Sequence, residues 1–115
     1  EFGCPYQLGH HQHANSPQDA DLATLPVVSG DIIIMGSDGL LDNVSELEMV
    51  QQVKQLTQAG ARPGAMAQQL AKLAFDNSLD KKRSTPYSRA ATEAFDMVYA
   101  GGKPDDITVL VAVVS

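Results

Sequence analysis

The sequence predicts a layered α/β fold, in which β-strands are flanked by an antiparallel pair of helices. Residues 32–35 are four consecutive apolar residues, too few for a helix core, and are typical of a strand buried on both faces. Residues 107–114 form a second apolar, β-branched run. Between the two runs, apolar residues recur at helical spacing in two neighbouring stretches. The two helices are expected to pack across one face of the sheet.

The segment before the first of these strands is expected to be mostly loop. It is interrupted by Pro5, Pro17 and Pro26 and is rich in polar residues. We expect a short extended piece at residues 6–8 and a short strand at residues 25–28. The three histidines of this segment are interpreted as part of a solvated loop rather than as a metal site, because they lack Cys or carboxylate partners at ligand spacing: His10, His11 and His13.

The strand at residues 32–35 is expected to end at an acidic turn. Asp38 and Gly39 follow it after two small residues. Glycine accepts the positive φ of a sharp turn at little energetic cost, so the chain is predicted to turn at Gly39. This places Asp38 at the rim of the sheet.

The last strand has its acidic residues before it rather than after it. Asp105 and Asp106 follow Gly-Gly-Lys-Pro and precede the apolar run. If the two strands pair antiparallel, Asp38 and Asp105 lie at the same edge of the sheet and face each other. Carboxylate oxygens without Cys or His suit a hard cation such as Mg2+ or Mn2+. The alternative is that these acids are ordinary turn residues.

The helix predicted after the first strand begins with a capping box, in which Ser45 and Glu48 satisfy each other's free amides. Gly60 is a plausible end for this helix. Its predicted apolar face consists of Leu47, Met49, Val50, Val53 and Leu56.

Pro63 suits the first position of the second helix. Its predicted apolar face consists of Met66, Ala67, Leu70, Ala71, Leu73 and Ala74. A third, short helix is expected at residues 87–95, within an insertion at 79–100, with Ala90, Ala91 and Ala94 facing inward.

Composition excludes several classes of protein. The formal charge of −6 and the isoelectric point near 4.7 disfavour nucleic-acid binding, and the one basic run, residues 81–83, is typical of a solvated loop. No apolar run reaches the roughly 18 residues of a membrane span. Cys4 is the only cysteine, so no intrachain disulfide forms.

Two segments resemble a known family. Residues 30–43, GDIIIMGSDGLLDN, and residues 101–114, GGKPDDITVLVAVV, resemble the two C-terminal signature segments of the metal-dependent protein phosphatases, the protein phosphatase 2C (PPM) family. The family motifs read roughly DG-x-x-D and D-[ND]-x-[ST]-V. The stretch DKKRSTPYSRAA and residues 5–8 resemble the branch found in mitochondria and chloroplasts.

The resemblance covers nearly all 115 residues but only half of the family's domain. It therefore implies the C-terminal half of an αββα sandwich, with residues 1–115 forming the C-terminal part of one catalytic domain. The N-terminal half, with its DGHGG-type motif, is not matched. By the family pattern, that half supplies a bridging Asp, a Gly carbonyl and a phosphate-binding Arg.

The family's activity is hydrolysis of phosphoserine and phosphothreonine in proteins by a metal-activated water. The resemblance implies that Asp38 and Asp105 bind the two catalytic Mg2+ or Mn2+ ions, and that Asp42 belongs to a weaker third ion. Asp106 is expected to support the ligands or to anchor the strand. Without the family pattern, Asp42 is interpreted as part of the turn before the helix.

The resemblance also implies partners and a compartment. We expect a phosphoprotein substrate, a monomer, and a mitochondrial or chloroplast location, with the cytoplasm as the alternative. We expect the chain alone to bind metal weakly and to be inactive without the N-terminal half. Two other functions stay open: a pseudophosphatase or interaction module that keeps the fold without catalysis, and a self-contained acidic α/β domain whose acids are only turn residues.

Overall fold

The structure is a computed structural model, and it describes residue 10 and residues 12–115. The predicted extended piece at residues 6–8 and the residues Cys4 and His11 lie outside this described part. The elements in chain order are η1 (Pro17–Asp19), β1 (Ile32–Gly36), α1 (Asp38–Leu41), α2 (Glu46–Gln58), α3 (Pro63–Leu79), α4 (Pro86–Phe95) and β2 (Val109–Val113).

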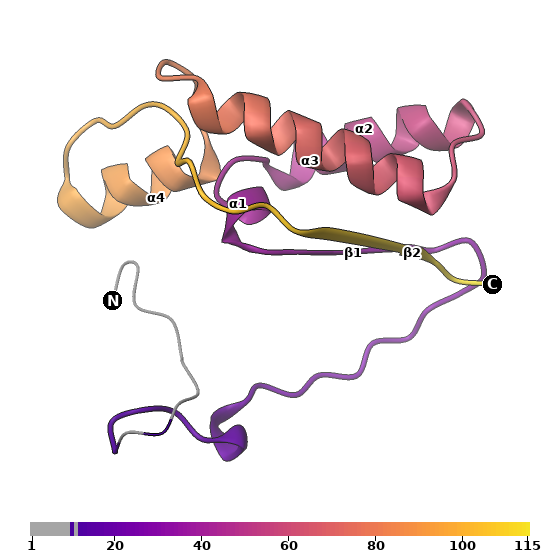
Figure 1. The fold of residues 1–115 in the computed structure, drawn as a ribbon, viewed down its shortest axis with the longest axis horizontal. Coiled ribbons are helices and arrows are strands. Elements are labelled where there is room, and N and C mark those ends of the chain that lie inside the picture. Colours follow the sequence, from indigo (N-terminus) through magenta and orange to yellow (C-terminus); the bar gives the residue numbers. More distant parts are fainter. Residues whose placement is uncertain (1–9, 11) are drawn as a thin grey trace.

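The fold has two layers, which confirms the α/β class (Figure 1). β1 and β2 pair antiparallel in a two-stranded sheet, from Ile32 opposite Val113 to Gly36 opposite Val109. The antiparallel helices α2 and α3 lie on one side of this sheet, and the segment before β1 runs away on the other side (Figure 1). No helix in the described part is long and apolar enough to cross a membrane.

Local signals set the helix boundaries. At the start of α2, the Ser45 backbone amide donates to Glu48 Oε1 over 3.1 Å, and the Glu48 amide donates to Ser45 Oγ over 3.2 Å. This is the predicted capping box. α2 ends just before Gly60, whose φ is +77°, and Pro63 begins α3 as predicted.

One hydrophobic core joins α1, α2 and α3. Its buried members are Leu40, Val44, Val53, Met66, Leu70 and Ala74. Ile32, Ile34, Val109 and Val111 pack against this core from the sheet. The core therefore fixes the short helix α1, which carries Asp38 and Asp42, against the longer helices.

The prediction that the first strand is buried on both faces is wrong for the described chain. Burial alternates along β1, and the side chains of Ile33 and Met35 remain 44% and 62% exposed. Leu110 on β2, which pairs with Met35, is 61% exposed. Apolar residues on both faces of a strand favour burial of both faces, but in this structure the helices cover only one face of β1 (Figure 1).

Three smaller expectations are also wrong. Residues 25–28 form no strand, and Leu25 is 79% exposed. Leu47 and Val50 on α2 are 66% and 62% exposed rather than packed. In α4 only Ala91 of the three predicted alanines is buried. In each case the spacing of apolar residues indicated which side of a segment would be buried, but it did not specify which other part of the fold would cover that side.

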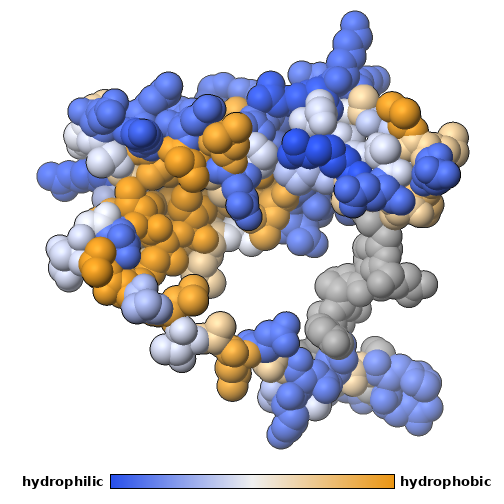
Figure 2. All heavy atoms as spheres, turned by 180° about the vertical axis from the view of Figure 1, so that it is seen from behind, coloured by the Kyte–Doolittle hydropathy of each residue, from blue (hydrophilic) through white to orange (hydrophobic). Residues whose placement is uncertain are grey.

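Exposed apolar side chains gather in one patch where α2 meets β1 (Figure 2). A groove of about 640 Å³ lies there, and its apolar lining comes from Ile32, Ile34, Met49, Val50 and Val53.

The buried carboxamide of Asn43 ties the end of α1 to the loop before β2. Asn43 is 0% exposed. Its Nδ2 donates to the carbonyl oxygens of Gly39 and Lys103, each over 2.9 Å. Its Oδ1 accepts from the Lys103 backbone amide over 2.8 Å. A single side chain thus joins two segments that are 60 residues apart in sequence.

A second set of polar contacts supports Asn43 from the helices. Asn77 Nδ2 on α3 donates to the Asn43 carbonyl over 2.9 Å and to Glu48 Oε2 over 3.3 Å. Arg83 forms an ion pair with the same Glu48 oxygen. Burial raises the pKa of the Glu48 carboxyl, but the donors from Ser45, Arg83 and Asn77 outweigh it and lower the pKa below its ordinary value.

We predict that Asn43→Ala destabilises the fold by about 2–4 kcal/mol, because it removes three hydrogen bonds and leaves buried backbone groups without partners. Urea unfolding measures this change. Gln69→Ala, at an exposed position of α3, is the control and should change stability by less than about 0.5 kcal/mol. Equal effects of the two substitutions would contradict the structural role of Asn43.

We predict that Glu48→Gln destabilises the fold by about 1 kcal/mol at neutral pH. Because the folded-state pKa of Glu48 is lowered, its contribution is present above the unfolded-state pKa and is lost as pH falls through the folded-state pKa. The difference from the original protein should therefore shrink in acid. Unfolding curves measured from pH 7 to pH 3 check this, with exposed Glu46→Gln as the control. If the difference in unfolding free energy did not change with pH, the predicted role of the Glu48 charge would be wrong.

Candidate metal centre

Both acidic segments lie at one end of the sheet. β1 ends at Gly36 opposite Val109, the first residue of β2, so the chain after β1 and the chain before β2 are adjacent (Figure 1). Ser37 joins them: its amide donates to the Thr108 carbonyl over 3.0 Å, and its Oγ accepts from the Thr108 amide over 3.0 Å. The antiparallel pairing that the sequence predicted is confirmed.

Gly39 allows the closest approach of the two segments. A Cβ at this position would lie 2.2 Å from the Asp106 carbonyl oxygen and 2.9 Å from Ile107 Cγ1. The expected positive φ is wrong, because Gly39 lies within α1 and is absent from the positive-φ glycines of the described residues. Glycine is required here because a side chain would push α1 away from the loop that carries Asp105.

Asp38 and Asp42 lie one helical turn apart on α1. Asp38 is its first residue and is exposed. Asp42 caps the C-terminal end, where its amide donates to the Asp38 carbonyl over 2.8 Å. Residues four positions apart on a helix lie on the same face. The structure thus brings these two predicted residues together.

Asp105 and Asp106 play different parts in the loop before β2. Asp105 is exposed, and its Oδ1 accepts from the Asp106 amide over 2.8 Å. Asp106 contacts the first segment through its backbone, since its carbonyl accepts from Ser37 Oγ over 3.1 Å. This contact joins the two segments through the Asp106 backbone and does not involve its carboxylate.

The other two predicted ligands act electrostatically on Asp42. Burial raises the pKa of the Asp42 carboxyl, and the negative charges of Asp38 and Asp105 raise it further. Lys103 acts in the opposite direction, with its Nζ 3.9 Å from Asp42 Oδ2. The side chain of Asp42 is 30% exposed. Asp38 and Asp105 are therefore both near enough to Asp42 for their charges to act on its carboxyl.

Two residues of this region were missed at the level of sequence. Lys103 lies beside Asp42, and Asn43 holds the Lys103 backbone. Both lie within the two segments that resemble the family's signatures, but neither is one of the acidic residues to which the resemblance gives a role. Their only signal is position: each lies directly beside an acidic residue or within two residues of one.

The donor chemistry fits a hard divalent ion, because the group consists of carboxylates with oxygens open to solvent. The positions of Asp38, Asp42 and Asp105 do not make a complete metal site. Among residues 10 and 12–115, no group of three or more His, Cys, Asp or Glu side chains is placed to hold a metal ion. His10 and His13 are exposed in the N-terminal segment. Octahedral coordination would need further oxygen donors beside Asp38, Asp42 and Asp105.

Comparisons with known proteins identify similar phosphatases. The chain is 40% identical to probable protein phosphatase 2C 80 of Arabidopsis thaliana over 99% of the chain and 27% of that relative. It is 40% identical to probable protein phosphatase 2C 55 of the same plant over 100% of the chain and 24% of the relative. It is 38% identical to the protein phosphatase PTC7 homolog fig of Drosophila grimshawi over 96% of the chain and 39% of the relative.

A solved structure agrees with these relatives. The X-ray structure of the photosystem II phosphatase PBCP matches with a TM-score of 0.87 and 33% identity, over 100% of this chain and 48% of that one. No protein-family model matches the chain. The chain thus spans about a quarter to two fifths of the length of the curated relatives named above. By sequence and fold together, it belongs to the protein phosphatase 2C (PPM) family.

Proposed function

We propose that this chain supplies Asp38, Asp105 and Asp42 to the metal centre of a Mg2+- or Mn2+-dependent protein serine/threonine phosphatase. The observation that carries the proposal is the meeting of the Asp38 turn and the Asp105 loop at one sheet edge. Ser37 and Gly39 hold the backbones of these segments in contact. The family membership supports a phosphatase rather than an unrelated cation binder.

Each of the three acids has a separate role in the proposal. Asp38 and Asp105 are the ligands of the two catalytic ions, because both are exposed and lie on opposite segments of the site. Asp42 is a ligand of a weaker third ion, since it lies further inside and beside Lys103. Bound ions would lower the pKa of the attacking water and neutralise charge on the phosphoryl oxygens.

The remaining residues orient these ligands. Asp105 Oδ1 is held by the Asp106 amide, which fixes the direction of the carboxylate. Asn43 holds the backbone at Lys103, two residues before Asp105. Precise placement of this kind is what metal-assisted phosphoryl transfer demands of the protein, because an octahedral ion tolerates little distortion.

The proposed substrate is a phosphoprotein, as the names of the similar proteins support. A mitochondrial or chloroplast location is also proposed, with the cytoplasm as the alternative. The similar solved structure is that of a photosystem II phosphatase, which supports the chloroplast as the proposed location.

We predict that Asp38→Asn and Asp105→Asn, each made in a protein with the complete phosphatase domain, weaken Mn2+ binding by at least about tenfold, because each removes a charged ligand. Isothermal titration calorimetry measures the affinity, and turnover of a phosphothreonine peptide should fall in parallel. Asp76→Asn is the charge-matched control, because Asp76 is an exposed residue that pairs with Lys72 on α3.

Unchanged Mn2+ affinity in both ligand variants would contradict the metal centre and would favour an acidic domain whose aspartates are only turn residues. Tight Mn2+ binding without turnover would favour a pseudophosphatase. Residues 1–115 alone should bind Mn2+ weakly and should not hydrolyse an aryl phosphate, since the described residues do not form a complete metal site.

A further inference from the structure

Lys103 is the cation beside the acidic group, and it has no part in the ligand set proposed above. Its Nζ lies 3.9 Å from Asp42 Oδ2 and 5.3 Å from the centre of the Tyr87 ring. The ammonium is thus close to two groups that attract a positive charge: a carboxylate and the face of an aromatic ring. Its side chain is 43% exposed, so the contact with Asp42 is at the surface of the site.

The backbone of Lys103 is held firmly in this position. Asn43 binds both its amide and its carbonyl. On the preceding residue, Gly102, a Cβ would lie 2.1 Å from the Asn77 carbonyl oxygen and 2.8 Å from Asn43 Oδ1. The backbone at Gly102 and Lys103 is therefore packed against buried groups, whereas the side chain of Lys103 is partly exposed.

Tyr87 is fixed to the same acidic residue from another element. Its backbone amide, in the first turn of α4, donates to the Asp42 carbonyl over 2.9 Å. The ring that faces the Lys103 ammonium is therefore tied to Asp42 rather than to the loop of Lys103. Asp42, Tyr87 and Lys103 therefore come together from the end of α1, the first turn of α4 and the loop before β2.

We propose that the Lys103 ammonium is an internal cation for Asp42 and competes with a divalent ion for this carboxylate. The inference rests on the proposed function and deepens it, because it names the residue that sets the occupancy of the third ion. An ion bound to Asp42 would lie within a few ångströms of the ammonium, where like charges repel. The ion therefore binds Asp42 only when the Lys103 side chain swings away.

The competition applies to Asp42 more than to the other ligands. Lys103 pairs with Asp42, whereas Asp38 and Asp105 form no ion pair among those identified in the described residues. Loss of the ammonium should thus strengthen the weakest ion site selectively. A change confined to the weakest site distinguishes competition by Lys103 from a general effect of net charge, because net charge would change the metal affinity of all sites together.

The experiment measures Mn2+ stoichiometry and affinity by calorimetry and by electron paramagnetic resonance, in a protein with the complete phosphatase domain. Lys103→Met removes the charge and keeps an unbranched side chain that is one atom shorter. The weakest Mn2+ site should become about three- to tenfold tighter. Lys103→Arg keeps the charge and should leave that site unchanged. Lys72→Met, which removes another lysine from a pair with an aspartate, should also change nothing.

A double variant locates the effect. When Lys103→Met is combined with Asp42→Asn, the gain in Mn2+ affinity should disappear, because the carboxylate over which the cations compete is gone. A gain that persists in the double variant would overturn the proposal. So would an unchanged weakest site in Lys103→Met, provided that thermal unfolding without metal shows the variant to be folded.

The outcome also separates this inference from the proposed function. If the protein binds Mn2+ through Asp38 and Asp105 but Lys103→Met has no effect on the weakest site, only the competition is wrong. If no variant binds Mn2+ at all, the metal centre and the competition are both wrong.

Discussion

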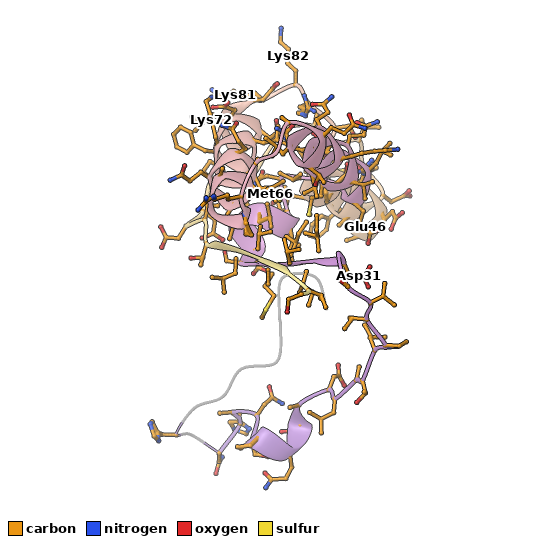
Figure 3. All side chains as sticks on the ribbon, turned by 90° about the vertical axis from the view of Figure 1, so that its right-hand side faces the viewer. Asp31, Glu46, Met66, Lys72, Lys81 and Lys82 are labelled. Carbon is orange, nitrogen blue, oxygen red and sulfur yellow. The ribbon has the colours of Figure 1, made fainter. Side chains whose placement is uncertain are left out.

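The arrangement of this chain depends on the buried carboxamide of Asn43. It donates to Gly39 in α1 and to Lys103 in the loop before β2, and it accepts from the Lys103 amide. Sheet pairing brings these segments to the same edge, but pairing ends at Gly36 and Val109. Beyond that point Asn43, Ser37 and the close contact at Gly39 determine where the acidic residues lie. The helices support this arrangement through Asn77, which donates a hydrogen bond to the Asn43 carbonyl. Figure 3 shows the packed side chains of the helical layer above the sheet.

The charged carboxylate of Asp42 is unfavourable for stability when no ion is bound. The folded-state pKa of Asp42 is raised, so its ionised form is favoured less in the folded chain than in the unfolded one. The protonated Asp42 carboxyl contributes favourably to stability below the unfolded-state pKa, and this contribution is lost as pH rises through the folded-state pKa. At neutral pH the charge on Asp42 therefore opposes folding. Such a residue is typical of functional sites, where charge is retained for binding rather than for stability. Lys103 partly offsets the repulsion, which links the stability of the metal-free chain to the competition proposed above.

Much of the fold follows from signals within a few residues of each other. The capping box at Ser45 and Glu48, proline at position 63 and the apolar run of β1 are local features, and the elements they predict are present. The adjacency of the segments that carry Asp38 and Asp105 could be predicted because antiparallel pairing alone brings the two strand ends together. The contacts of Asn43 and Lys103 could not, because they join positions 60 residues apart and depend on how loops pack. The exposed face of β1 and the exposed Leu47 were misjudged since an apolar pattern does not specify what covers it.

The most direct test of the metal centre is the crystal structure of the complete phosphatase domain with Mn2+, with the ions located by their anomalous scattering. The account predicts Mn2+ within about 2–2.5 Å of carboxylate oxygens from both Asp38 and Asp105. Mn2+ bound only at other residues, with the Asp38 and Asp105 carboxylates free of metal, would contradict it.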